Sequence, residues 1–158
     1  MTKTRTRLQR IDPYEFEEFI ADLWDLQGWR TKVTPASNDG GIDVIASKGL
    51  IRKQTWAFQV KRHGPGSKVG TPAVQQYSSL PHQHRTIDRV AIISSNTFTD
   101  GAREIAAKLD VTLIDGEELV KRWKRHGSDD LLDKYDPETV EPSWLQRTWK
   151  LAAAIWKR

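Results

Sequence analysis

The sequence predicts an α/β fold in which helices pack around a central mixed β-sheet. Three strand patterns come early in the chain, and a strand–helix–strand–helix order follows them. Neighbouring early strands can pair as a hairpin, whereas strands that are joined through a helix pair in parallel. A length of 158 residues fits one domain, and this order of elements is typical of a sandwich built on one sheet.

The first predicted element is a helix over residues 13–27. Asp12 can cap its N-terminus, Pro13 suits the first helical position, and Glu15 stands where a capping box requires an acid. Gly28 ends the helix. Helical spacing of large apolar residues predicts its buried face, which consists of Phe16, Phe19, Ile20 and Leu23.

The next elements are short strands, expected over residues 31–34, 42–46 and 55–62, with a turn-rich loop over 35–41. A glycine-rich loop over residues 63–70 then leads to a second helix. The remaining elements are a helix over 72–80 closed by Pro81, a buried strand over 89–95, a helix over 100–109, a buried strand over 111–114, and a helix to residue 125 that Asp115 caps with Glu118 as its partner.

Composition excludes several classes of protein. The chain has no cysteine, which removes disulfides, thiolate metal sites and cysteine nucleophiles. No apolar run is long enough to cross a bilayer, and the basic first residues lack the apolar stretch of a secretory signal. We therefore expect a soluble, cytoplasmic protein with no membrane partner. Residues 1–126 are expected to form the domain, 127–143 a linker, and 144–158 a separate amphipathic helix.

Seven tryptophans are many for this length. Four of them fit core or core-edge positions: Trp24, Trp29, Trp56 and Trp123. In the terminal helix an apolar stripe, surrounded by basic residues, consists of Leu145, Trp149, Ala152 and Trp156. Aromatic stripes of this kind usually contact protein, so the helix is expected to dock on the domain or on a second copy of the chain rather than on DNA.

The charge of the chain is unevenly distributed. The net charge is +4, but residues 44–87 contain seven Lys or Arg residues and no Asp or Glu, whereas residues 110–141 contain ten acids and five bases. A basic surface attracts a polyanion, because each neutralised phosphate releases counterions. The charge pattern therefore favours nucleic acid as the partner over a merely solvated basic face.

Three polar residues can meet on neighbouring strands. Gln59 and Lys61 lie two residues apart, so they share one face of their strand while Val60 occupies the other. Asp43 opens the preceding strand and reaches the same patch if the two strands form a hairpin. A carboxylate and an amide oxygen suit a hard cation such as Mg²⁺, and a lysine beside it can activate water or stabilise charge that develops on a phosphate.

At these motifs the sequence resembles the Mrr-type restriction endonuclease family, which belongs to the PD-(D/E)XK nucleases together with archaeal Holliday junction resolvases. The resemblance covers residues 12–123 and lies in the runs FEEFIADLWDLQGW, DGGIDV, FQVKR, FTDGA and LIDGEEL. It implies a restriction-endonuclease-like three-layer sandwich with a mixed β-sheet flanked by helices. It also implies a DNA endonuclease that uses Mg²⁺, for which Mn²⁺ can substitute.

The resemblance assigns roles to individual residues. It makes Asp43 the principal metal ligand and Lys61 the catalytic lysine, and it places Gln59 where most of the superfamily has Asp or Glu. An amide adds no charge, so the site would need another carboxylate. Glu17 is the expected donor, because it lies at the edge of the apolar helix face and the resemblance also places a glutamate there. The alternative is an ordinary surface acid.

Further residues are expected to contact DNA or are set aside. The loop after the catalytic strand can clamp a DNA backbone or be a plain connector. The expected DNA contacts are Lys48, Arg62, His63, Ser67, Lys68 and Gln76. Asp39 is assigned to a turn, and His82 and His84 are expected to be exposed because a metal site needs more ligands.

Several functions compete at this stage. The leading hypothesis is a homodimeric endonuclease, since two cuts in a duplex need two sites. Its substrate is either modified DNA or a branched junction, and a stand-alone or partner-recruited nuclease is favoured because no separate recognition domain fits in 158 residues. The alternatives are an inactive DNA-binding module with a nuclease fold, and a basic assembly protein that acts through its tail.

Overall fold

The computed structural model describes residues 3–35 and 41–139. The expected terminal helix over 144–158, Asp39 and most of the predicted 35–41 loop lie outside the described residues. Within the described ranges, no helix is both long and apolar enough to span a membrane.

A five-stranded mixed sheet forms the centre of the molecule, with strand order β1-β2-β3-β5-β7. The first three strands pair antiparallel, whereas β3, β5 and β7 run parallel to one another. The predicted mixed sheet is therefore confirmed. Its strands are β1 (Arg30–Val33), β2 (Val44–Lys48), β3 (Gln54–Lys61), β5 (Arg89–Ser94) and β7 (Val111–Ile114).

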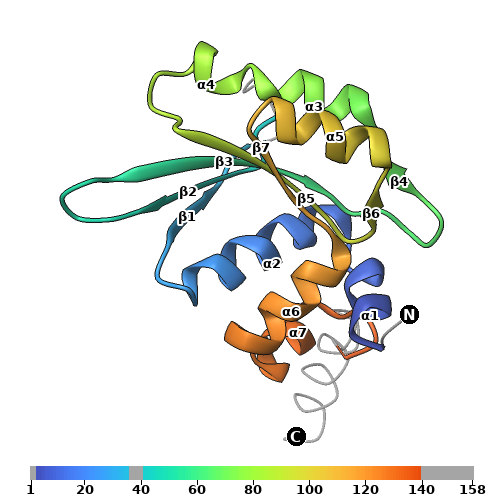
Figure 1. Cartoon of the computed structure of the whole chain (residues 1–158). Coiled ribbons are helices and arrows are strands. Elements are labelled where there is room, and N and C mark those ends of the chain that lie inside the picture. Colours follow the sequence, from blue (N-terminus) through green and yellow to red (C-terminus); the bar gives the residue numbers. More distant parts are fainter. Residues whose placement is uncertain (1–2, 36–40, 140–158) are drawn as a thin grey trace, which may run out of the picture.

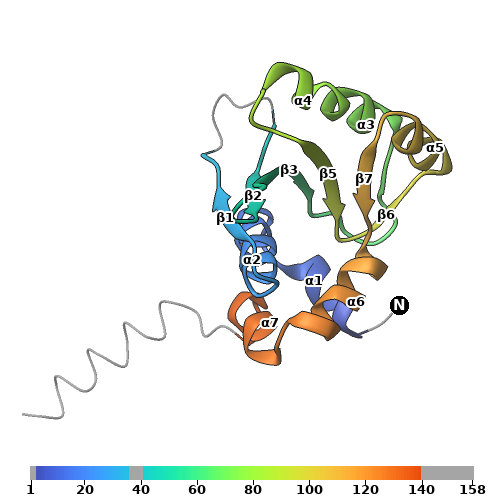
Figure 2. The same cartoon turned by 60° about the vertical axis from the view of Figure 1, so that its left-hand side comes forward.

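Helices cover both faces of this sheet and complete three layers (Figures 1 and 2). One outer layer contains α1 (Lys3–Arg10), α2 (Pro13–Asp25), α6 (Gly116–His126) and α7 (Asp129–Tyr135). The other contains α3 (Thr71–Ser78), α4 (Leu80–Gln83) and α5 (Asp100–Lys108). The three-layer sandwich predicted from the sequence is confirmed.

Strand alternation divides the core into two halves. On β3, Phe58 and Val60 pack with the α2 layer, whereas Ala57 packs with the α3 layer. Because side chains alternate along a strand, Gln59 and Lys61 share the face of Ala57. The polar residues of β3 therefore lie on the α3 face of the sheet.

The predicted capping of two helices is confirmed. The Asp12 carboxylate accepts a hydrogen bond from the Tyr14 amide at 2.9 Å at the start of α2. Asp115 accepts from the Glu117 and Glu118 amides at the start of α6. The predicted closing role of Pro81 is wrong, because Pro81 lies in the first turn of α4, where a missing N–H removes no helical hydrogen bond.

Two short elements around the glycine-rich loop were not predicted. Within residues 63–70, the two-residue strand β4 (Lys68–Val69) pairs in parallel with β6 (Thr97–Phe98). This small second sheet ties the segment after β3 to the segment after β5. Their strands are too short to show an alternating pattern in the sequence.

The expected linker is corrected over its described part, residues 127–139. This segment forms α7, whose Leu132 is fully buried in the core beside α2. The Tyr135 hydroxyl donates to the Asp22 carboxylate of α2 at 2.6 Å, and Lys134 pairs with the same carboxylate at 2.8 Å. A seven-residue helix carries too little periodic pattern to stand out in an acidic stretch.

The unpredicted helix α1 is held to the same region by ion pairs. Arg7 pairs with Asp133 and Asp136, and Arg10 pairs with Asp136 and Glu138. The buried Asp136 carboxyl has a lowered pKa although burial acts to raise it, because Arg7 donates to it. The basic residues of α1 therefore attach the segment after α6 to the domain through ion pairs.

We expect Leu132→Ala to lower the free energy of unfolding by about 2–5 kcal/mol, because it leaves a cavity at a fully buried position. Urea unfolding followed by circular dichroism measures the change. Leu50→Ala is the matched control, since Leu50 is 96% exposed and its truncation is expected to stay within about 0.5 kcal/mol of wild type. Equal stability of the two variants would contradict a core role for α7.

Candidate active site

The antiparallel register of β2 and β3 brings Asp43 to Gln59. Val44 pairs with Phe58, and the Asp43 amide donates to the Phe58 carbonyl at 2.9 Å, which continues the ladder by one residue. The Asp43 Oδ2 atom then accepts from Gln59 Nε2 at 2.8 Å and from the Val60 amide at 2.7 Å. The predicted convergence of the two side chains is present.

Lys61 lies in the same cluster. Burial raises the pKa of the Asp43 carboxyl, while the Val60 hydrogen bond and the positive charge of Lys61 act to lower it. Lys61 lies two residues after Gln59 on the same face of β3, so its side chain extends from the same side of the sheet. The three residues named from the strand pattern therefore form one site at the end of β3 that follows Val60.

Glu17 joins this site from α2, in the opposite helical layer. Burial, followed by the negative charges of Asp43 and Glu18, raises the pKa of its half-buried carboxyl to about 7. The carboxylate also lines a shallow hollow of about 260 Å³ together with Val33 and Thr34. Glu17 and Asp43 thus repel each other across the end of the sheet, which is not the setting of an ordinary surface acid.

These residues fit a hard divalent cation. Gln59 Oε1 is buried and has no hydrogen-bond partner, and burial raises the pKa of both the Asp43 and the Glu17 carboxyl. Half a turn of the amide would place Oε1 beside Asp43, where a cation would satisfy both oxygens. Among the described residues, no three Asp, Glu or His side chains form a metal-binding cluster, so the Gln59 oxygen would be the third ligand.

Gly41 and Tyr77 also shape the site, and sequence reasoning missed both. Gly41 has a φ of +88°, and a Cβ atom there would lie 2.4 Å from the Tyr77 hydroxyl oxygen and 2.8 Å from Gln59 Oε1. Glycine therefore keeps the space beside the amide oxygen open. The pKa of the buried Tyr77 hydroxyl is raised by burial and then by the charge of Asp43. Tyr77 reads as an apolar helix position, and only the DGG run of the sequence points to a special backbone here.

Most of the residues expected to contact DNA follow Lys61 in the sequence. Arg62 and His63 directly follow Lys61, and the His63 amide donates to Ser95 Oγ at 2.9 Å. Burial, followed by the charges of Lys61 and Arg62, lowers the pKa of the His63 imidazole. The exposed residues of the set are Lys48, Ser67, Lys68 and Gln76. Their contacts with DNA stay predictions.

Lys48 lies away from the cluster. It ends β2, whereas Asp43 precedes the first residue of that strand, and five residues of β-strand span about 17 Å. The Lys48 ammonium donates to the Gln27 carbonyl at 3.0 Å and lies 5.6 Å from the Trp29 ring centre. Lys48 cannot reach a phosphate held at Asp43.

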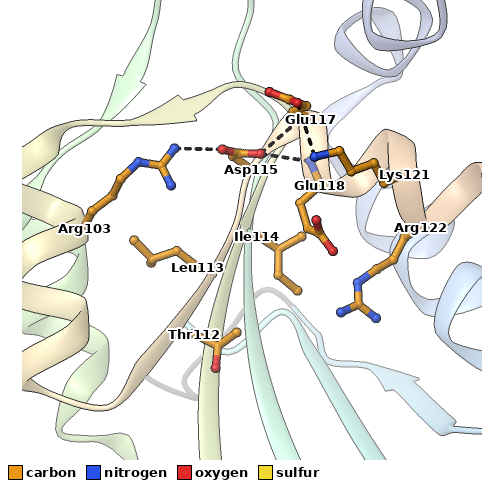
Figure 3. Close-up of a pocket in the computed structure, with 9 residues that line it drawn as sticks. All are labelled: Arg103, Thr112, Leu113, Ile114, Asp115, Glu117, Glu118, Lys121 and Arg122. Carbon is orange, nitrogen blue, oxygen red and sulfur yellow. Dashed lines mark hydrogen bonds and ion pairs between the residues drawn. The ribbon is translucent and has the colours of Figure 1, made fainter.

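Two other features lie outside the site. A pocket of about 430 Å³ opens on the outermost strand β7, where Arg103 pairs with Asp115 (Figure 3). Asp115 also caps α6, so both oxygens of its carboxylate already accept hydrogen bonds, one from Arg103 and the other from the Glu117 and Glu118 amides. His82 is exposed on α4, as expected, and His84 is half-buried just after it.

Comparison with solved structures identifies the fold. The chain is similar to the DNA modification-dependent restriction endonuclease AspBHI at 18% identity and a TM-score of 0.63, over 88% of this chain and 40% of that one. It is similar to the MspJI restriction endonuclease in complex with a 27-mer oligonucleotide at 21% identity and a TM-score of 0.55, over 82% and 32%. Restriction endonuclease FokI bound to DNA matches at 8% identity and a TM-score of 0.50, over 84% and 29%. The fold is that of restriction endonucleases.

The family follows from the sequence itself. The family model Mrr_cat, described as a restriction endonuclease, matches residues 8–123. The chain therefore belongs to the Mrr-type restriction endonuclease family, as its motifs indicated. It spans about a third of the length of MspJI and 40% of AspBHI. No curated protein matches the sequence.

The raised pKa of Glu17 predicts a pH-dependent stability. Because the folded-state pKa is about 7 against an ordinary 4.5, the folded protein binds more protons between these pH values, and stability falls as pH rises through this window. Glu17→Gln mimics the protonated form. Its midpoint of urea unfolding is expected to equal that of wild type near pH 4 and to exceed it above pH 7.

Glu18→Gln is the control for this measurement, because Glu18 is exposed on the same helix and contributes the smallest of the three effects on Glu17. Its gain above pH 7 is expected to be smaller. A Glu17→Gln variant with the pH profile of wild type would show that the Glu17 carboxyl does not face Asp43.

Proposed function

We propose that the protein is a metal-dependent DNA endonuclease that hydrolyses phosphodiester bonds. The observation that carries this proposal is the bonded pair of Asp43 and Gln59, with Lys61 beside it and Glu17 facing it from α2. Membership of the restriction endonuclease family supports a nuclease. The acid-free segment over residues 44–87 supports DNA as the substrate.

Each side chain has a distinct part in this proposal. Asp43, Glu17 and the Gln59 oxygen would hold Mg²⁺ or Mn²⁺, which supplies a Lewis acid and an activated water when bound. The Lys61 ammonium stands where it can stabilise the charge that develops on the phosphate. The Val60 amide holds one Asp43 oxygen, which fixes the direction in which the carboxylate presents its other oxygen.

Two finer features complete the proposal. Cutting both strands of a duplex requires two sites, so we propose a homodimer, which gel filtration or analytical ultracentrifugation would detect. The substrate is either modified linear duplex or a four-way junction. Cleavage rates on a junction, a plain duplex and a methylated duplex of one sequence would separate these classes, with Asp43→Asn as the negative control.

We expect Asp43→Asn and Lys61→Ala each to lower the rate of plasmid cleavage in Mg²⁺ by about 10²-fold or more, because each removes charge from the reacting centre. Lys108→Ala is the matched control, since Lys108 is exposed at the end of α5 and, among the described residues, forms its ion pair with its helix neighbour Glu104. Its rate should equal that of wild type.

The same assay tests the rival function. A wild-type protein that binds DNA but never cuts it in Mg²⁺ or Mn²⁺, on any of these substrates, would be a DNA-binding module with a nuclease fold. Unaltered cleavage by Asp43→Asn would instead show that the active site lies elsewhere.

A further inference from the structure

The hairpin formed by β2 and β3 projects from the body of the molecule (Figure 1). Lys48 pairs with Gln54 at its end, so residues 49–53 form the connecting turn. We call residues 48–53 the hairpin tip. Neither the family motifs nor the carboxylate cluster uses this segment.

Two adjacent aliphatic side chains stand out at the hairpin tip. Leu50 is 96% exposed and Ile51 is 99% exposed. Gly49 fixes the turn that presents them, because its φ is +105° and a Cβ atom there would lie 2.3 Å from the Arg52 carbonyl oxygen. Single exposed apolar residues are common on surfaces, but a neighbouring pair held on a projecting turn is suited to insertion into a partner.

Positive charge surrounds this apolar pair. Lys48, Arg52 and Lys53 flank it in the sequence, and no acid occurs between residues 44 and 87. At the base of the tip lies a hollow of about 440 Å³, whose lining contains three basic residues and no acid. The lining residues are Gly28, Arg30, Ser47, Lys48, Gly49, Leu50 and Lys53. The tip therefore complements a polyanion that also offers an apolar slot.

The hairpin tip connects to the candidate active site along one face of the sheet. In the register of β1 and β2, Arg30 pairs with Ser47 and Lys32 pairs with Ile45, and paired residues point to the same side. Ser47 and Ile45 alternate with Asp43 on that side. The exposed Arg30 and Lys32 thus form a basic track between the carboxylate cluster and the tip.

We propose that the hairpin tip inserts Leu50 and Ile51 into the minor groove of duplex DNA, while the flanking basic residues hold the adjacent phosphates. Apolar wedges of this kind unstack a base step and bend the duplex. This inference rests on the proposed nuclease function for its choice of partner. The shared face and the absence of acids favour DNA over a protein or a membrane surface.

The length of β2 sets where the wedge enters. Lys48, where the tip begins, lies five residues after Asp43, which is about 17 Å at about 3.3 Å per residue. DNA rises about 3.4 Å per base pair, so the tip begins about five base pairs from the phosphate that is cut, and Leu50 and Ile51 enter at that step or just beyond it.

The test measures binding of the full chain in EDTA, where no cleavage occurs, by fluorescence anisotropy with a labelled duplex of about 25 base pairs that contains flexible TA steps. The double variant Leu50→Ala/Ile51→Ala is expected to lower the affinity about tenfold or more, with an unchanged salt dependence. Arg52→Ala/Lys53→Ala is expected to lower the affinity and to reduce the salt slope by about two. Leu109→Ala, at an aliphatic side chain 43% exposed after α5, should bind as wild type.

A second readout reports insertion itself. Wild type should raise the emission of 2-aminopurine placed about five base pairs from the cleaved phosphate, because the base unstacks, and the aliphatic double variant should not. No rise with wild type at any position would overturn the insertion. Unchanged DNA affinity of the double variant would overturn the proposal as well. If that variant had instead lost self-association or binding to phosphatidylserine vesicles, the partner of the tip would be a second copy of the chain or a membrane and not DNA.

Failure of the two proposals can be told apart. A protein that cuts DNA with unaltered affinity in the aliphatic double variant is a nuclease without this wedge. A protein whose binding and 2-aminopurine response depend on Leu50 and Ile51, but which never cuts, uses the wedge without being a nuclease.

Discussion

The pairing register of β2 and β3 is the constraint on which the candidate site depends. It places Asp43 opposite Gln59, and the Val60 amide then anchors one oxygen of the carboxylate. A slip of one residue would turn every side chain of the strand to the other face, so Gln59 and Lys61 would point into the α2 layer and Phe58 into the α3 layer. The buried Phe58 and Val60 therefore enforce the register that the polar residues need.

The negative charge of the site is only partly compensated, because the pKa of Asp43 stays raised although the Val60 amide and Lys61 act to lower it. Two carboxyls face each other from different layers, and Gln59 contributes an amide where a third carboxylate would increase the repulsion. The folded chain accepts this arrangement with raised pKa values and an unsatisfied amide oxygen. Such a cluster costs stability in the absence of a cation, and stability conceded at a site is a sign of function.

Sequence reasoning reached the elements with strong periodicity and the residues whose placement follows from strand alternation. The strand over 111–114 and the helix capped by Asp115 were predicted within a residue, and Gln59 and Lys61 were placed on one face. It failed where distant contacts decide. The helix α7 is stabilised by contacts of Leu132 and Tyr135 with α2, which is distant in the sequence. Tyr77 contributes its hydroxyl to the site, although its position in the helix pattern is that of an apolar residue. Lys48 shares the acid-free segment with Lys61 but stands at the other end of its strand.

The ion pairs between α1 and the segment of α7 hold the two ends of the described chain on the same side of the molecule. Both helices belong to the layer opposite α3 (Figure 2). The described chain therefore begins and ends on the side of the sheet opposite the face that carries Arg30 and Lys32. Neither end of the described chain thus lies over the basic track of Arg30 and Lys32.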